Sequence, residues 1–157
     1  MLNIGIKAPD FSAKDQNGQL HTLADYADKY LLLYFYPRDN TPGCTAEACS
    51  FRDRYDVYHN QNIEIVGVSK DSSGSHGKFA DRFSLPFTLL SDPDKIIMMA
   101  YDTLSQKNFM GKTYIGTNRV SYLIDPKGMI VRVYEKVNPL THAKDVLASS
   151  RADLSWA

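Results

Sequence analysis

The stretch PRDNTPGCTAEAC, residues 37–49, contains both cysteines of the 157-residue chain. It directly follows Tyr30–Tyr36, an apolar run that predicts a strand covered on both of its faces. Thr41 is a typical N-cap and Pro42 is a favoured first helical residue. The sequence therefore predicts a strand that leads through a short turn into a helix spanning about residues 42–59.

Cys44 lies in the first turn of this predicted helix, where unpaired backbone N–H groups and the helix dipole favour a negative charge. We therefore expect its thiol to lose a proton more readily than a free cysteine does. A nearby cation would favour the thiolate further, and the pattern offers Arg38, Arg52 and Arg119 without choosing among them. Such a thiolate can attack the O–O bond of a peroxide and become a sulfenic acid. The alternative is that the cysteines are simply small buried hydrophobic residues.

Cys49 is the only other thiol in the chain, so it is the one that could condense with a sulfenic acid to form an intramolecular disulfide. In an ideal helix, residues five apart have Cα atoms roughly 8.6 Å apart, which exceeds the ~7 Å limit for a disulfide. We therefore predict that a bridge between Cys44 and Cys49 requires the helix to unwind around residues 45–49.

The rest of the sequence alternates between strand-like and helix-like segments. We expect a hairpin around Asn17-Gly18, strands at 63–69, 87–90, 120–124 and 129–134, and helices at 78–83, 92–101 and 141–149. Three segments have no regular prediction: 71–77 is expected to be a loop with a capping serine, 103–118 mostly loop with some extended structure, and 151–157 unassigned. The early βαβ unit requires parallel strands, and the last two strands form a hairpin. An α/β fold with a mixed central sheet flanked by helices on both faces follows.

Composition narrows the classes of function. The length predicts a single domain over residues 1–157. The 18 Lys and Arg residues balance the 18 Asp and Glu residues, which argues against a nucleic-acid partner. There is no membrane-length apolar run and no signal-peptide pattern, so a cytoplasmic, reducing compartment is expected. The few Cys and His residues show no metal-ligand spacing, so no metal site is expected, and no Ser or Cys has a His partner that the sequence would indicate.

Residues 36–53, YPRDNTPGCTAEACSFRD, closely resemble the active-site signature of the peroxiredoxins, and within them the bacterioferritin-comigratory-protein or Q-type branch. Weaker similarity covers most of the chain, including APDF at 8–11, GVS at 67–69 and LID at 123–125. The resemblance implies a thioredoxin-like fold with an N-terminal hairpin extension.

The resemblance also implies roles for individual residues. Cys44 matches the peroxidatic cysteine and Cys49 the resolving cysteine. Thr41 matches the residue whose hydroxyl binds the peroxide, and Pro37 matches the proline that shields the thiolate from water. Arg119 matches the arginine that holds the thiolate and the peroxide.

Glu47 matches an acidic position of the branch that is expected to orient an arginine. The implied activity is that of a peroxidase that reduces hydrogen peroxide and alkyl hydroperoxides and serves antioxidant defence. Thioredoxin or a similar dithiol protein is the implied reductant, and the implied state is a monomer, with a dimer as the alternative. No cofactor is implied.

Two other functions compete with this interpretation. A thiol–disulfide oxidoreductase of the same fold would usually carry Cys-x-x-Cys and a proline before the late strand. Here four residues separate the cysteines, and Val120 occupies the proline position. A binding module that keeps only the fold is the second alternative. The chain also departs from the family pattern at 103–118 and 120–122, and it lacks the Gly-Gly-Leu-Gly motif linked to over-oxidation, which favours resistance to inactivation by peroxide.

Overall fold

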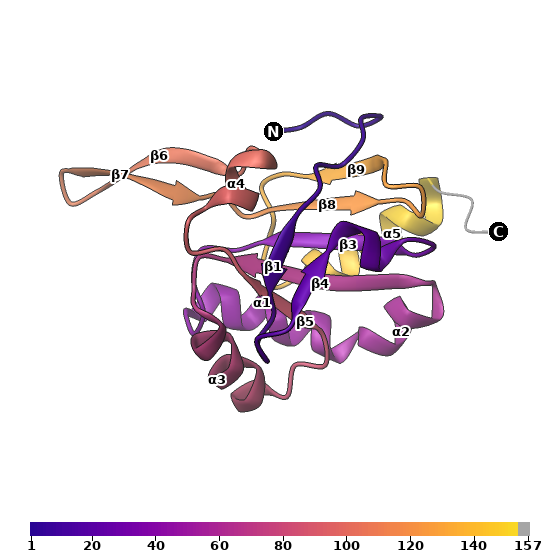
Figure 1. The fold of residues 1–157 in the computed structure, drawn as a ribbon, viewed down its shortest axis with the longest axis horizontal. Coiled ribbons are helices and arrows are strands. Elements are labelled where there is room, and N and C mark those ends of the chain that lie inside the picture. The colour runs from indigo at the N-terminus through magenta and orange to yellow at the C-terminus, as the bar shows by residue number, and fades with distance from the viewer. Residues whose placement is uncertain (154–157) are drawn as a thin grey trace.

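A computed structural model describes residues 1–153, and a five-stranded mixed sheet forms its centre (Figure 1). The sheet has the order β5-β4-β3-β8-β9 and consists of β5 (Thr88–Ser91), β4 (Ile63–Ser69), β3 (Tyr30–Phe35), β8 (Val120–Ile124) and β9 (Ile130–Tyr134). β3, β4 and β5 are parallel, whereas β8 runs antiparallel to both β3 and β9. The predicted mixed sheet is therefore confirmed.

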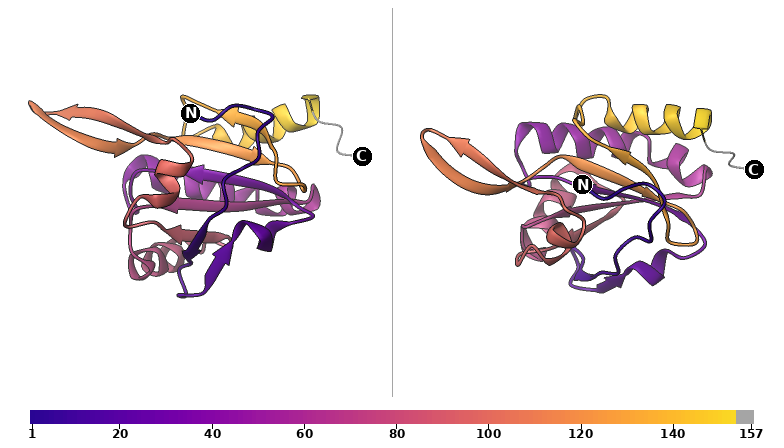
Figure 2. Two further views of the ribbon diagram at one scale, coloured as in Figure 1. Left: turned by 45° about the horizontal axis from the view of Figure 1, so that its top comes forward. Right: turned by 90° about the horizontal axis from the view of Figure 1, so that it is seen from above.

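Alternate residues of β3 point to opposite faces of the sheet, and each face carries its own apolar core. Leu32 and Tyr34 belong to one core, whereas Leu33 and Phe35 belong to the other. The first face is covered by α1 (Pro42–Asp53), α2 (Tyr55–Asn60), α3 (Ser73–Phe83) and α5 (His142–Asp153). The second is covered by the N-terminal segment, the 3-10 helix η1 (Leu23–Tyr26) and α4 (Ile96–Ala100), as Figure 2 shows from two further directions.

The N-terminal hairpin is confirmed as β1 (Ser12–Lys14) paired antiparallel with β2 (Leu20–Thr22). Its loop is closed by Asp15, whose Oδ1 accepts hydrogen bonds from the backbone N–H groups of Asn17 and Gln19. Gly18 has a φ of +79°, a conformation that glycine adopts without the steric cost that a Cβ would bring.

The single helix predicted for residues 42–59 is wrong, because the chain forms two helices, α1 and α2, that meet at Arg54. Arg54 leaves the helical conformation with φ −113° and ψ 11°. Beyond the break, Tyr58 is buried and its hydroxyl donates to the carbonyl of Ala143 at 2.6 Å. Tertiary packing of α2 against α5 thus overrides the local tendency to continue one helix.

The prediction that residues 71–77 form a loop is also wrong, because α3 already begins at Ser73. The expected capping serine is Ser72, whose Oγ accepts from the backbone N–H of Ser75 at 3.1 Å. Gly74 and Gly77 are weak helix formers, so the local sequence does not indicate that the helix begins at Ser73. The burial of His76 against the sheet supplies the packing that stabilises the first turns.

Residues 103–118 contain a regular hairpin, β6 (Leu104–Phe109) and β7 (Lys112–Thr117), where mostly loop was expected. Met110 and Gly111 form its turn with φ values of 51° and 80°, the combination of a type I′ turn. Figure 1 shows the hairpin extending away from the central sheet. Most of its side chains are exposed, so the alternation of apolar and polar residues that identifies a strand is missing from the sequence.

The remaining differences lie at element boundaries. The helix expected at 92–101 is restricted to 96–100, and the side chain of Asp92 accepts from the backbone N–H groups of Ile97 and Met98. α5 continues to Asp153, so residues 151–153 are helical rather than unassigned, and Trp156 lies outside the described residues. In the described part of the chain, helices are too short or too polar to cross a membrane.

Candidate active site

Cys44 is the third residue of α1, as the sequence predicts, and its side chain is only 1% exposed. β3 delivers the chain to this point, and Thr41 stands at the N-cap with φ −80° and ψ 153°. Cys49 lies later in the same unbroken helix and is half-buried. Both cysteines are free thiols. While α1 remains intact, they are too far apart to form a disulfide.

Thr41 stands at the expected N-cap, but its hydroxyl does not bond to the helix. Its Oγ1 instead donates to the carbonyl of Arg38 at 3.1 Å, within the turn that precedes α1. The N–H groups of the first turn of α1 are therefore left uncapped by this side chain. They remain available to an anion or a polarised oxygen that reaches Cys44.

Arg119 is the arginine that the structure brings to Cys44. Its Nη2 lies 3.5 Å from the Cys44 sulfur. Arg38 is exposed, and Arg52 donates to the carbonyl of Phe83 near the other end of α1. The choice among three arginines that the residue pattern left open is thereby decided in favour of the residue directly before β8.

Gly43 is what allows the guanidinium of Arg119 to approach the start of α1. A Cβ at position 43 would lie only 3.1 Å from the Arg119 Nη2 and 3.7 Å from the ring of Pro139. The contact of 3.1 Å is tighter than ordinary packing, so with a Cβ at this position the guanidinium would have to shift by a few tenths of an ångström. The glycine thus leaves room for the guanidinium at its present distance from the thiol.

Glu47 lies one helical turn after Cys44 and forms an ion pair with Arg119, with Oε1 2.9 Å from Nη1. It is 1% exposed, and burial raises its pKa to about 7 although Arg119 acts in the opposite direction. Burial by itself lowers the pKa of Arg119, but Glu47 and Cys44 more than offset this and raise it overall. Within residues 1–153, the second Glu47 oxygen and the Tyr34 hydroxyl are both buried without a hydrogen-bond partner.

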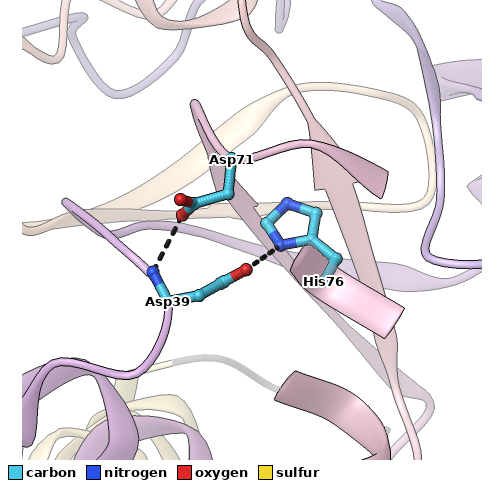
Figure 3. Close-up of side chains that lie close together, drawn as sticks. All are labelled: Asp39, Asp71 and His76. Carbon is cyan, nitrogen blue, oxygen red and sulfur yellow. Dashed lines mark hydrogen bonds and ion pairs between the residues drawn. The ribbon is translucent and has the colours of Figure 1, made fainter. Parts of the chain in front are cut away.

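Pro37 lies two residues beyond the end of β3 and is half-buried. Asp39 follows it in the same turn and is buried with His76 of α3, and their Oδ2 and Nδ1 atoms are 2.7 Å apart (Figure 3). This pair was not predicted from the sequence. Its only signal in the sequence was a polar segment after a buried strand.

Asp39, Asp71 and His76 could in principle form a metal site, because their ligand atoms all lie within 4.8 Å of one another. Each of the three side chains already has protein partners, however. Asp71 accepts from Ser69 at 2.6 Å and from the backbone N–H of Asp39 at 2.8 Å. A cation would have to replace these hydrogen bonds, so the donor set is that of a completed polar network rather than of an open metal site.

A second histidine pair was also not predicted. The Nε2 of His142 lies 2.7 Å from the Oγ of Ser121, contrary to the expectation that no serine has a histidine partner. Both residues are buried, and burial lowers the pKa of His142 to about 4. A substrate cannot reach this serine in the folded chain, so the pair belongs to the core.

Comparison with known proteins adds to this geometry. Residues 4–133 match the AhpC/TSA family. Peroxiredoxin Bcp of Bacillus subtilis (strain 168) is 42% identical over 146 residues, which cover 93% of each protein. The chain belongs to the peroxiredoxins, in their Bcp or Q-type branch. Peroxiredoxin Bcp of Escherichia coli (strain K12) is 40% identical over 93% of this chain and 94% of its own length.

Solved structures agree with this assignment. The bacterioferritin comigratory protein of Xanthomonas campestris, studied for its alkyl peroxide reduction activity, has a TM-score of 0.89 at 34% identity and covers 96% of this chain and 98% of its own. A cysteine-to-serine mutant of Xylella fastidiosa PrxQ has a TM-score of 0.92 at 33% identity, covering 99% of both chains. The thioredoxin-like fold is therefore confirmed. This peroxiredoxin is a thiol-dependent peroxidase whose substrate is a peroxide and whose reductant is a thiol.

Proposed function

We propose that Cys44 is the peroxidatic cysteine of this peroxiredoxin. Its thiolate attacks the distal oxygen of hydrogen peroxide or an alkyl hydroperoxide, so that an S–O bond forms as the O–O bond breaks. The departing hydroxide or alkoxide takes a proton and leaves as water or an alcohol, and Cys44 becomes a sulfenic acid. The observation that carries this proposal is the 3.5 Å contact between the Cys44 sulfur and Arg119 at the start of α1.

Arg119, Thr41 and the first N–H groups of α1 act on the charge that develops in this step. The guanidinium stabilises the thiolate before reaction and the oxygens of the peroxide during it. Glu47 keeps the guanidinium in place through its 2.9 Å ion pair. Pro37 covers the thiol on the side of the preceding turn and limits its contact with water.

Cys49 is the resolving cysteine in this scheme. Its thiolate attacks the Cys44 sulfur, an S–S bond forms, and the oxygen of the sulfenic acid leaves as water after taking up a proton. Since both cysteines belong to the continuous helix α1, the segment around residues 45–49 has to unwind first.

A dithiol protein of the thioredoxin kind then reduces the disulfide by exchange, taking the oxidising equivalents as its own disulfide. A monomer in the cytoplasm, with no nucleic-acid or membrane partner, is the proposed setting. The balanced count of acidic and basic residues and the two free thiols support this setting.

The test compares peroxide consumption by the wild type, Cys44→Ser and Cys49→Ser with thioredoxin and its reductase as the electron source. The wild type should turn over, and Cys44→Ser should fall to the uncatalysed rate. Cys49→Ser should lose turnover with thioredoxin but react once with peroxide and recover activity with a small monothiol. Unchanged consumption by Cys44→Ser would overturn the assignment of the peroxidatic cysteine.

A further inference from the structure

A buried polar network lies beside the turn that carries Pro37 and Thr41, and the peroxide chemistry makes no direct use of it. Its centre is the carboxylate of Asp39, which is almost completely buried. Oδ1 accepts from the Tyr36 hydroxyl at 2.7 Å, and Oδ2 accepts from the Ser75 hydroxyl at 2.8 Å. The Nδ1 of His76 lies 2.7 Å from the same Oδ2.

His76 is fixed from both sides of its ring. It is 0% exposed, and its Nε2 lies 3.0 Å from the carbonyl of Leu90 in β5. A carbonyl can only accept, so Nε2 carries a hydrogen. The carboxylate of Asp39 accepts from two hydroxyls and lies 2.7 Å from Nδ1, so both ring nitrogens of His76 have a hydrogen-bond partner. The ring therefore connects Asp39 rigidly to the central sheet.

Asp39 is held through its backbone as well. Its N–H donates at 2.8 Å to the Oδ2 of Asp71, which lies two residues beyond the end of β4 (Figure 3). The next residue, Asn40, has a φ of +62°, in the left-handed region that asparagine adopts more readily than most residues with a side chain. The side chain and the backbone of Asp39 thus hold the turn by contacts with other parts of the fold.

The turn lacks the hydrogen bond that usually fixes the entry into a helix. An N-cap hydroxyl normally accepts from the second or third helical N–H group and so fixes the entry into the helix. Thr41 makes no such bond in this chain. Its hydroxyl bonds instead to the carbonyl of Arg38 within the turn, and Asp39, two residues from both Pro37 and Thr41, ties the turn to β4 and α3.

We propose that His76 is a positioning residue for the peroxide reaction: through Asp39 it fixes the turn that places Pro37 and Thr41 over Cys44. The role is indirect, because His76 reaches the site only through Asp39. The inference rests on the proposed function, since it takes Cys44 as the reacting thiol. A small shift of this turn changes the distance between the peroxide-binding hydroxyl and the sulfur, on which the rate depends steeply.

The test measures two reactions of the reduced protein under the same conditions: oxidation of Cys44 by hydrogen peroxide, which needs the arranged site, and its alkylation by iodoacetamide, which needs only an accessible thiolate. His76→Leu should slow the peroxide reaction about tenfold or more while alkylation changes less than about twofold. His76→Asn, whose amide nitrogen can take the Nδ1 position, should restore most of the peroxide rate. If His76→Leu does not fold, His76→Gln replaces it, because its longer amide reaches Leu90 but not Asp39.

His21→Leu is the matched control, because it breaks another His–Asp pair, 2.7 Å long, in the N-terminal hairpin. This variant should keep the wild-type peroxide rate. Equal losses in the peroxide and alkylation rates of His76→Leu, no loss in either, or a similar loss in His21→Leu would overturn the positioning role. Failure of the proposed function looks different, because the wild type and Cys44→Ser would then react with peroxide alike.

Discussion

At the scale of single residues, the reactive centre depends on how closely Arg119 can approach the first turn of α1. Gly43 leaves room for this approach. Glu47 holds the guanidinium by an ion pair with its Nη1 atom. The sequence motif identifies both positions, but it does not reveal why each residue type is needed. The reason becomes visible only in the three-dimensional structure, because Arg119 lies more than 70 residues away from both Gly43 and Glu47 in the chain.

Gly43→Ala should weaken the contact between Arg119 and Cys44. The added methyl group would lie 3.1 Å from the guanidinium, and the flexible arginine side chain is the part that must move. We expect peroxide oxidation of Cys44 to become about tenfold slower, as measured by stopped-flow fluorescence. Gly74→Ala is the control, because a Cβ there meets only the Ser72 hydroxyl at 3.8 Å, and it should react at the wild-type rate.

Glu47→Gln should change how stability depends on pH. Burial raises the pKa of Glu47 to about 7, above its ordinary value of 4.5. The folded state therefore binds the proton more tightly, and this contribution to stability is present below pH 4.5 and is lost as the pH rises to about 7. Relative to the wild type, Glu47→Gln should gain on the order of 2 kcal/mol in unfolding free energy between pH 5 and pH 8. Urea unfolding of the two reduced proteins between pH 5 and pH 8 measures this difference in unfolding free energy. A difference that does not change with pH would contradict the raised pKa of Glu47.

At the scale of secondary-structure elements, α1 is the part of the fold that must change during the proposed cycle. Addition of one equivalent of peroxide should reduce helical circular dichroism and expose the amides of residues 45–49 to hydrogen exchange. Cys49→Ser stops at the sulfenic acid and should keep both signals unchanged. A Cys44–Cys49 disulfide within a fully protected α1 would contradict the predicted unwinding.

The elements also differ in how well they can be predicted from the local sequence. β3 and the start of α1 were predictable, because an apolar run, an N-cap residue and a proline each carry a local signal. β6 and β7 were not, since a hairpin with two exposed faces has no alternation to detect. The break at Arg54 depends on Tyr58 contacting α5, which is a long-range effect that local propensity does not contain.

At the scale of the whole molecule, the site is assembled from distant parts of the chain. Cys44 and Arg119 could be paired only by family resemblance, since the residue pattern left three arginines open. The contacts of Asp39 with His76 and of Ser121 with His142 were not foreseen at all. Such buried pairs join different elements, and nothing in the local sequence of one partner specifies the other.

Two buried groups, Glu47 and His142, should change the stability of the molecule in opposite directions as the pH rises. Burial lowers the pKa of His142 from 6.5 to about 4, so the stability that comes from keeping it neutral is present above pH 6.5 and is lost as the pH falls towards 4. His142→Gln should therefore reduce the acid-induced loss between pH 7 and pH 4.5 by on the order of 2 kcal/mol. Urea unfolding at both pH values tests this, and an equally steep loss in the variant would point to other groups.

The identity and connectivity of the oxidised sulfur atoms show which cysteine reacts with peroxide and which one resolves the sulfenic acid. The reduced wild type is treated with one equivalent of hydrogen peroxide, trapped, digested and mapped by mass spectrometry. The same treatment of Cys49→Ser includes a sulfenic-acid probe. We predict an intramolecular Cys44–Cys49 disulfide in the wild type and the probe on Cys44 in the variant. Oxidation that begins at Cys49, or a Cys44 thiol that survives the peroxide, would contradict it.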